Sequence, residues 1–367
     1  MKKIFQKLFN KNENPLEDSP YSEFWNWFKL HSKEFHQIIK SGHEVEKRFV
    51  EDFALRLDQL DLQINFLVGL DADGDAELIF TPDGILKYVI HAEDLASSAP
   101  AISNWKFKAL KRAMKINGFG VKSGDFYFNS ENIQFYPNNQ DQYPDEINLV
   151  FVYDQYHVEA HQELLNGVYI FLDNFLGEEL IMEKIDHIEL RGPGKDIDEL
   201  ISVEKLKDYI IWREKEFLEK YQQVNYNSLE DELTLFEGTV DQGIPMLSVI
   251  NCKALEWEYK ASHPWMLVII QNYQPKDELG LPDDSSLNLF ENIQSDMETL
   301  LPESAGYIQI GTETLDGRRE LFIACREYRQ ATRMAKLIQQ KYQQRMEIDF
   351  DIFKDKYWKT FNNYRIV

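Results

Sequence analysis

The order of apolar periods and turn signals between residues 265 and 350 most constrains the fold of this chain. Residues 265–273 form a short apolar run, rich in β-branched side chains and bounded by prolines, which is typical of a buried strand. It is followed by a helix, two strands, a helix and a last strand, expected at residues 284–301, 307–314, 318–325, 331–343 and 346–350. The order is therefore strand, helix, strand, strand, helix, strand.

This element order predicts an antiparallel sheet of four strands with both helices on one face, the ferredoxin-like βαββαβ sandwich. Residues 266–270 are apolar at consecutive positions, whereas a strand with one solvated face would alternate. Both sides of this strand should therefore be covered. Since the two helices cover one side, the other should be covered by additional strands at 233–251, the N-terminal domain or a second subunit.

An Asp-Gly pair between the second and third strands predicts a hairpin. A two-residue turn would place Glu313 opposite Glu320, and like charges directly opposite each other are unfavourable. A three-residue loop at 315–317, with Gly317 in the left-handed region as a bulge, instead places Glu313 opposite Arg319. The charges therefore predict the three-residue loop.

The residues before this core predict a further α+β domain. Two helices are expected within 21–60, followed by a strand meander at 64–70, 76–80 and 85–91. Later strands are expected near 126, 133 and 149–153, and two more helices at 158–175 and 203–221. Residues 222–232 are polar and have no period, so we interpret them as a linker. The sequence thus predicts a two-domain α+β protein, with an N-terminal domain over 1–222 and a C-terminal ferredoxin-like domain over 233–367 that begins with an added strand pair.

The formal net charge of −23 limits the partners that the chain can bind. Residues 224–367 contain 15 Lys and Arg against 23 Asp and Glu, and residues 1–223 contain 25 against 40, so neither half is basic. An acidic surface repels the phosphate backbone of nucleic acids. The composition therefore argues against nucleic-acid binding and favours a protein partner, including a basic one, whose association the charge would accelerate.

No apolar run approaches the roughly eighteen residues that a membrane span requires. Cys252 and Cys325 are too few for a disulfide framework, and we expect both to be reduced and buried in a cytoplasmic protein. Polar residues interrupt the basic N-terminal segment MKKIFQKLF, unlike the apolar core of a signal peptide. A short amphipathic turn on a membrane and a frayed or docked terminus are the alternatives for this segment.

Two patterns resemble metal sites but lack the required spacing. The alternating acids at 71–77 resemble a calcium loop, yet the glycine is misplaced and a proline stands where the bidentate glutamate belongs. The histidines at 157 and 161 lie in HVEAH rather than HExxH, and no third ligand is evident. The sequence therefore predicts no metal and no cofactor.

The candidate binding residues are His263, Arg318, Arg319 and Glu320. His263 stands before the first strand of the six-element core, and a role as general base would require a nucleophile and an acid to converge on it. A hydrogen-bonded structural histidine is the alternative. Arg318 and Glu320 share one face of a hairpin strand, where their first expected role is to hold the strand register, and ligand binding is secondary.

The Gly-Leu-Pro at 280–282 opening a helix, together with TETLDGRRE at 312–320 leading into a buried strand, is a specific combination. Because of this combination, residues 245–361 resemble the bacterial domain of unknown function numbered 695. The whole chain is similar to two-domain members of that family from Bacteroidetes-type bacteria. The family offers no established catalytic residues to transfer. Some bacterial proteins join this domain to one resembling the protein inhibitor of ribonuclease E, which favours a binding or regulatory role.

We therefore expect a soluble, cytoplasmic, two-domain α+β protein that binds another protein and is not an enzyme. One alternative is a hydrolase with a cleft between the domains, for which His263, Arg318 and Glu320 would be tested first. Another is an acidic, immunity-type protein that occupies a basic active site. A deep cleft with perturbed carboxylates and a histidine would favour the enzyme, and a flat acidic patch the binders. The sequence leaves a homo-oligomer open.

Overall fold

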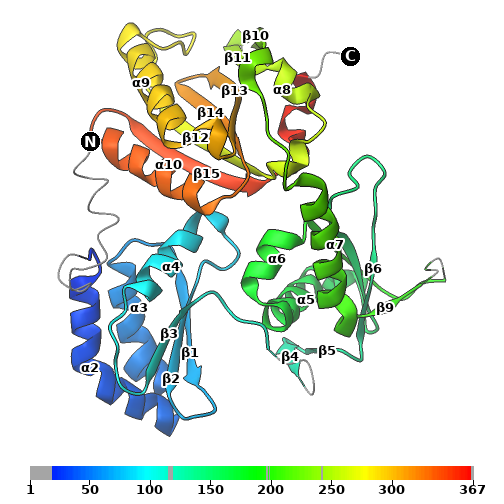
Figure 1. The fold of residues 1–367 in the computed structure, drawn as a ribbon. Helices are drawn as coiled ribbons and strands as arrows, with labels where there is room; N and C mark the ends of the chain where they lie inside the picture. Colours follow the sequence, from blue (N-terminus) through cyan, green and yellow to red (C-terminus); the bar gives the residue numbers. More distant parts are fainter. Residues whose placement is uncertain (1–18, 115–118, 196, 198, 241–242, 365–367) are drawn as a thin grey trace. The chain divides into compact units, whose positions relative to one another are not determined.

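The computed structural model describes residues 19–114, 119–195, 197, 199–240 and 243–364, and helices and strands alternate through it as an α+β fold (Figure 1). Its contacts divide the chain into two compact units, residues 1–113 with 177–179 and residues 114–176 with 180–367. The N-terminal segment with the amphipathic pattern lies outside the described residues. None of the helices in the described part of the chain is long and apolar enough to cross a bilayer.

The first unit packs helices on a three-stranded sheet. Its elements are α2 (Ser22–Ser41), a π-helical turn (Glu46–Val50), α3 (Glu51–Asp58), β1 (Asn65–Leu70), β2 (Ala76–Thr81), α4 (Val89–Ser97) and β3 (Trp105–Ala109). β1 is antiparallel to β2, and β2 is parallel to β3. Aromatic rings dominate the core, since Phe28 of α2 packs edge to face on both Phe53 of α3 and Trp105 of β3.

The strand predicted at 85–91 is wrong. These residues form a 3-10 turn (Leu86–Tyr88) and the beginning of α4. The buried positions Val89, Ala92 and Leu95 recur every three residues, which is the spacing of a helix rather than a strand. Because β2 and β3 are parallel, the chain needs such a crossover between them.

The second unit begins with a four-stranded sheet of order β8-β7-β6-β9 and a small strand pair. The elements are β4 (Gly120–Ser123), β5 (Phe126–Asn129), β6 (Ile133–Pro137), β7 (Asn148–Tyr153), α5 (His161–Leu176), α6 (Glu178–Lys184), β8 (His187–Arg191), β9 (Ile201–Ser202) and α7 (Leu206–Tyr221). Every residue of β7 is buried, as its unbroken apolar sequence requires. The two later helices predicted for this region are confirmed, as α5 and α7.

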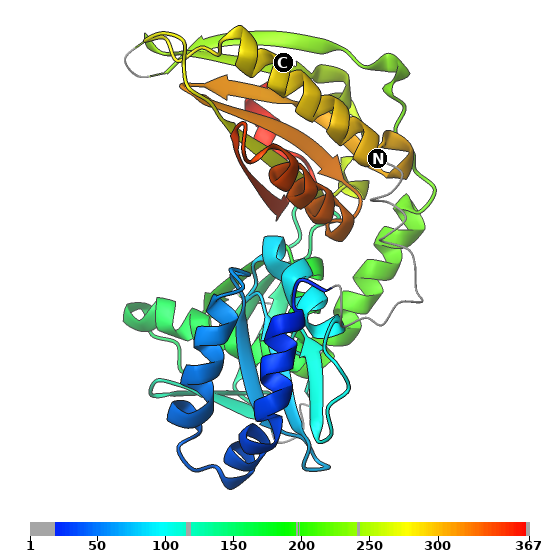
Figure 2. The ribbon, with the colours of Figure 1, turned by 90° about the vertical axis from the view of Figure 1, so that its left-hand side faces the viewer.

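The C-terminal part of this unit is a six-stranded antiparallel sheet of order β10-β11-β13-β14-β12-β15. Its elements are β10 (Leu233–Thr239), β11 (Pro245–Asn251), α8 (Cys252–Glu256), β12 (Trp265–Asn272), α9 (Asp284–Leu300), β13 (Tyr307–Leu315), β14 (Arg318–Cys325), α10 (Arg329–Tyr342), β15 (Glu347–Lys354) and a 3-10 segment (Lys359–Tyr364). The six predicted elements are all present. Figure 2 shows α9 and α10 on one side of the strands.

The other side of the sheet is covered by α8 and the C-terminal 3-10 segment. The side chains that pack together there include Leu255, Met266, Val268, Phe322, Trp358 and Phe361. Leu267 and Ile269 of β12 are buried as well, so both sides of this strand are covered, as predicted. The predicted source of the cover is wrong: the strands at 233–251 extend the sheet beside β13 rather than covering its face.

The hairpin between β13 and β14 also differs from the prediction. Glu313 pairs with Glu320, and the turn contains only Asp316 and Gly317, with φ of 44° and 77°. A two-residue turn with both central residues in the left-handed region matches the twist of the flanking strands. Gly317 has the predicted positive φ, but the three-residue loop is wrong.

Neighbouring side chains relieve the like-charge pair that this register creates. Glu320 accepts a hydrogen bond from Arg318 Nε at 2.9 Å, and Glu313 accepts one from the Tyr364 hydroxyl at 2.6 Å. Burial raises the pKa of Glu313, and the neighbouring Glu320 carboxylate adds to the increase. The favourable turn therefore outweighs a repulsion whose cost is only a few tenths of a kcal/mol.

We expect the Glu313→Gln variant to be about 0.2–1 kcal/mol more stable than the wild type at pH 7, since it removes this repulsion and keeps an acceptor for Tyr364. A raised folded-state pKa stabilises the wild type below the unfolded pKa, and that contribution is lost as the pH rises through the folded pKa. Urea unfolding should therefore show the advantage of the variant at pH 7 and little of it at pH 4. Equal stabilities at pH 7 would contradict this account.

Candidate functional site

The candidate residues from the sequence lie in separate places. His263 stands at one end of β12, and Arg318 pairs with Asn272 at the other end. Since a strand rises about 3.3 Å per residue, roughly 30 Å of chain separates the two sites. Arg319 and Arg318 are neighbours in β14 and so face opposite sides of the sheet. The four residues therefore do not form one site.

His263 is buried and hydrogen-bonded to neighbouring protein groups. It is 1% exposed, and burial, with the nearby Arg326, lowers its pKa to about 3, so the imidazole is neutral. Its Nδ1 lies 2.8 Å from Ser262 Oγ, but that hydroxyl donates to the Tyr259 carbonyl at 2.7 Å. The carbonyl of His263 accepts a hydrogen bond from Trp358 Nε1 at 3.1 Å. These contacts support the structural alternative for this histidine.

Arg319 is buried between the sheet and α9. Its guanidinium lies 4.9 Å from the centre of the Phe290 ring and donates to Gln271 Oε1 at 3.3 Å and Gln294 Oε1 at 3.1 Å. Burial lowers its pKa to about 10, which still leaves it charged at neutral pH. Arg319 therefore packs the helix onto the sheet.

Arg318 and Glu320 lie on the opposite side, in an open hollow of about 580 Å³. Glu313, Asp351 and Tyr364 contribute to its wall. The guanidinium of Arg318 is already bonded to Glu320, and the hydroxyl of Tyr364 to Glu313. The hollow thus places three carboxylates around one arginine. The Arg318–Glu320 contact lies within β14 rather than between strands, so the role of these residues in strand register stays a prediction.

Side chains in the two patterns that resemble metal sites contact other protein side chains. In the first unit, Lys106 of β3 donates to Asp71 and forms ion pairs with Asp73 and Asp75, so a lysine supplies the positive charge inside the acidic turn. Elsewhere, His161 Nδ1 lies 3.0 Å from the Tyr156 hydroxyl. No group of three or more His, Cys, Asp or Glu side chains suited to a metal occurs among the described residues.

The two cysteines are free, as expected. Cys325 is buried in β14, and burial raises the pKa of its thiol. Cys252 is only partly buried, because it begins the short helix α8 at the edge of the sheet. The prediction that both are buried is therefore wrong for Cys252.

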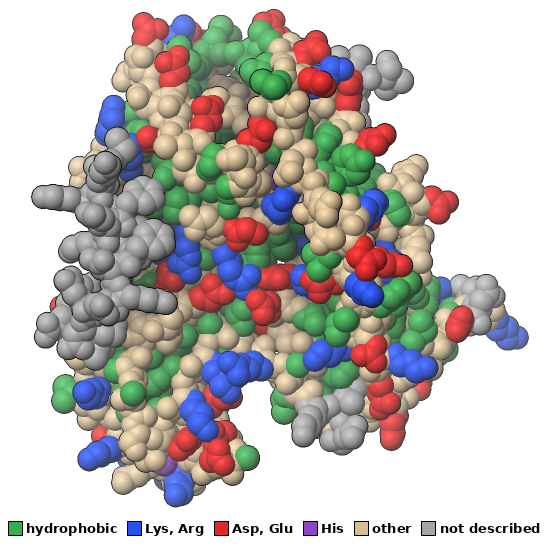
Figure 3. All heavy atoms as spheres, viewed as in Figure 1, with side chains coloured by type: hydrophobic (Ala, Val, Ile, Leu, Met, Phe, Trp, Pro, Cys, Tyr) green, Lys and Arg blue, Asp and Glu red, His purple; other side chains and the backbone are tan. Residues whose placement is uncertain are grey.

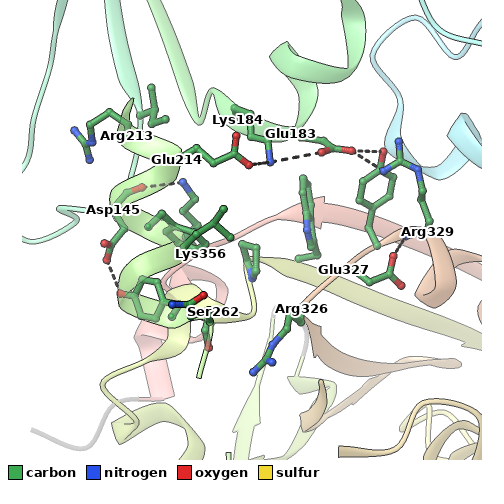
Figure 4. A pocket seen from close by; sticks show the side chains of 18 residues that line it. Asp145, Glu183, Lys184, Arg213, Glu214, Ser262, Arg326, Glu327, Arg329 and Lys356 are labelled. Atoms are coloured by element: carbon green, nitrogen blue, oxygen red, sulfur yellow. Dashed lines mark hydrogen bonds and ion pairs between the residues drawn. The ribbon is translucent and has the colours of Figure 1, made fainter. Parts of the chain in front are cut away.

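A charged pocket of about 360 Å³ lies where α6, α7, the start of β12 and the start of α10 approach one another (Figure 4). Sequence reasoning missed it, because its residues come from segments far apart in the chain. The charged residues that line it are Asp145, Glu183, Lys184, Arg213, Glu214, Arg326, Glu327, Arg329 and Lys356. Positive and negative groups alternate around its wall.

One carboxylate of the pocket is held by three donors. Asp145 accepts hydrogen bonds from the hydroxyls of Tyr357 at 2.6 Å and Tyr221 at 2.7 Å, and from Lys220 Nζ at 3.0 Å. Burial opposes the ionisation of Asp145, but these hydrogen bonds together outweigh it and lower its pKa. This carboxylate is therefore charged and fully engaged.

The other charges of the pocket also pair. Glu183 lies 2.6 Å from Arg329 Nη1, and Glu214 lies 2.5 Å from Lys184 Nζ. Within the described lining, Arg326 carries a buried Nε without a hydrogen-bond partner, although its Nη2 donates to the Val224 carbonyl. The pocket thus leaves few groups for a ligand, and its pairs instead join α6 to α7 and α6 to the start of α10.

A groove of about 410 Å³ between α9 and strands β10, β11, β13 and β14 has a different composition. Its described lining contains the carboxylates of Asp231, Glu298 and Glu303 but no lysine or arginine. Apolar residues of the lining include Leu233, Met297, Leu301 and Ile323, and uncharged polar residues such as Asn251, Gln294 and Gln309 also contribute. We call it the acidic groove.

The strand beside this groove, β10, is one of the two edges of the sheet. Among the residues that the structure describes it pairs only with β11, and its Leu233 and Leu235 are 65% and 56% exposed. Because Leu233 lines the acidic groove, Leu235, two residues on, faces the same side, as does the opposite Val249. We call Leu233, Leu235 and Val249 the β10 strip. In Figure 3, hydrophobic side chains lie beside acidic ones at the top of the view, where Figure 1 places β10.

The comparisons identify only the C-terminal region. No curated protein and no solved structure matches the chain. Residues 234–365 match the model of a family of unknown function, DUF695. The match begins within β10 and spans the rest of the six-stranded sheet, so it contains the strings at 280–282 and 312–320 that carried the resemblance. It includes most of the acidic groove, but Asp231 and Leu233 lie before its first residue. The C-terminal region of the chain is therefore a DUF695 domain.

Proposed function

We propose that the protein is a non-catalytic binding module that takes a partner protein at the β10 strip and the acidic groove. The observation that carries the proposal is the edge strand β10, whose outer side pairs with no strand among the described residues. Natural proteins protect such edges with charge, and β15 at the other edge carries Glu347, Asp349 and Asp351. β10 carries only one acidic residue, Glu237, and exposes two leucines. An edge strand also offers unpaired backbone groups to an extended segment.

The proposal includes the architecture that presents this edge. The strand order β15-β12-β14-β13, with α9 after the first strand in sequence and α10 after the third, supports a ferredoxin-like core that β11 and β10 extend. The start of the family match at residue 234 supports a domain boundary between 222 and 233, with domains over 1–222 and 233–367. The two free cysteines support a cytoplasmic location.

The hydrolase alternative has less support, because burial lowers the pKa of His263 to about 3 and so makes it a weak base. His263 is also distant along β12 from Arg318 and Glu320. The acids that the pocket collects are engaged by cations or hydroxyls. An immunity-type role would be one case of the binding function, in which the partner is a basic enzyme.

A peptide selection tests the proposal without assuming the chemistry of the partner. Random sixteen-residue peptides displayed on phage are selected on the full-length protein, and their affinities are compared with the Leu233→Ser/Leu235→Ser variant. Full burial of a leucine is worth about 1.5–3 kcal/mol, so losing two half-exposed ones should weaken binding at least about thirtyfold. The matched control is Leu30→Ser/Leu55→Ser, whose leucines are 83% and 65% exposed in the first unit. Peptides that bind both variants equally would refute the proposed site.

A further inference from the structure

We infer that the partner segment is basic and extended, and that it adds as a further strand beside β10 while its cationic side chains reach the acidic groove. The inference rests on the proposed function and specifies the charge and the conformation of the partner segment. It combines three features of the described residues: an unpaired strand edge, an apolar strip, and carboxylates gathered on one side of that strip.

The carboxylates of the groove are available to a cation. Asp231 accepts a hydrogen bond from the Tyr226 hydroxyl, and Glu303 Oε1 lies 3.4 Å from the backbone amide of Ser228. Glu298 Oε1 lies 3.4 Å from the side-chain amide of Gln294. These donors are neutral, in contrast to the lysines and arginines that neutralise the acids of the charged pocket. The groove therefore keeps its negative charge.

The apolar part of the surface suits the stems of long basic side chains. Lysine and arginine bury their methylene chains on apolar surface while the charged head reaches a polar group. The exposed Leu233 lies in the same groove as Glu298, so it offers apolar surface to the stem of a basic side chain whose head reaches that carboxylate. Since alternate side chains of a strand share a face, every second residue of the segment should be Lys or Arg.

Charge also selects against a second copy of this chain. Pairing two β10 strands would bring together the acidic residues that flank Leu233 in both copies, namely Glu230, Asp231, Glu232 and Glu237. Like charges facing each other across strands are destabilising. A basic strand would instead be attracted by these acidic residues, and attraction between opposite charges raises the rate of association.

The first experiment measures binding of fluorescent, acetylated ten-residue peptides to the full-length protein by anisotropy. The peptide of alternating Lys and Val should bind at least tenfold more tightly than the one of alternating Glu and Val, and 500 mM NaCl should weaken it several-fold relative to 100 mM. Methylation of alternate backbone nitrogens on one edge should weaken it at least tenfold, because those amides can no longer pair with β10. Equal affinities of the basic and acidic peptides, or no effect of methylation, would overturn the inference.

The second experiment locates the basic contacts. The Glu298→Gln/Glu303→Gln variant should bind the Lys-Val peptide about threefold to tenfold more weakly, since both amides keep an acceptor but lose the charge. Glu291→Gln, an exposed position on the same helix outside the groove, should not change the affinity. An equal effect of the control and the groove variant would place the attraction in the net charge and reject the groove.

The two proposals fail separately. Selected peptides that require Leu233 and Leu235 but are acidic, or that tolerate backbone methylation, would leave the binding site in place and reject a basic, extended partner. Selected peptides that do not require the leucines would reject the site itself. Sedimentation velocity is the remaining check, because a dimer of the full chain that Leu233→Ser/Leu235→Ser dissociates would make a second copy the occupant and overturn the inference.

Discussion

Replacing Asp186 with alanine is expected to destabilise the second unit by about 3–5 kcal/mol, because it leaves buried lysines without a counter-charge. The Asp186 carboxylate lies 2.7 Å from Lys356 Nζ and 3.4 Å from Lys354 Nζ, and it accepts the backbone amide of Ile147 at 2.7 Å. The side chains of Asp186, Lys354 and Lys356 are only 8%, 12% and 9% exposed. Urea unfolding followed by circular dichroism at pH 7 measures the loss.

The pH dependence of this loss gives a second measurement. Burial lowers the pKa of Lys354 to about 8, so its folded state is favoured as the lysine loses its proton, and this contribution is lost as the pH falls through about 8. Without Asp186 the charged form is disfavoured further, so the gap between variant and wild type should narrow from pH 7 to pH 9.5. The control is Glu189→Ala on the adjacent strand β8, whose exposed carboxylate should contribute less than about 0.5 kcal/mol. A comparable loss in the control would show that the buried position is not the cause.

The elements of the C-terminal sheet could be predicted because each carries its signal locally. β12 has consecutive apolar residues because both of its faces are buried. Leu289, Ile293 and Met297 of α9 recur at helical spacing because one face of that helix is buried. The Asp-Gly pair at 316–317 likewise specifies its own turn. Local patterns of this kind do not depend on which distant segment provides the contact.

The register of the hairpin depended on a distant residue and was predicted wrongly. The charge rule that disfavoured Glu313 opposite Glu320 considers the two strands alone, while the Tyr364 hydroxyl that bonds Glu313 lies 51 residues later in the chain. Arg319 raises the same difficulty, since an arginine is usually exposed but here finds Phe290, Gln271 and Gln294 across the sheet and helix. Single-residue preferences do not contain such partners.

The acidic groove could not be predicted for the same reason. Asp231 stands in the segment that we interpreted as a linker, and Glu298 and Glu303 lie near the end of a helix whose apolar face had explained its pattern. Their charges appeared to be ordinary solvated positions. Only the antiparallel pairing of β10, β11 and β13 brings the three together beside one exposed strand.

Replacing Trp358 with alanine should destabilise the second unit by about 3–5 kcal/mol, the usual cost of removing a large aromatic side chain from a core. Trp358 is fully buried on the side of the sheet opposite α9, and it belongs to the cluster formed with Met266 of β12 and Phe322 of β14. Its Nε1 donates to the His263 carbonyl at 3.1 Å. The variant would open a cavity over the central strands and leave that buried carbonyl without its donor. Urea unfolding at pH 7 measures the change.

Two further variants separate the packing of Trp358 from its hydrogen bond. Trp358→Phe keeps most of the ring volume and loses the donor, so it should cost about 1–3 kcal/mol. Trp212→Ala removes a half-exposed tryptophan of α7 and should cost less, because less apolar surface returns to water. A Trp358→Ala loss no larger than that of Trp212→Ala would mean that the C-terminal segment does not cover the sheet in solution. The β10 strip would then not be the main uncovered surface of this domain, since the whole face of the sheet beneath Trp358 would also be open to a partner.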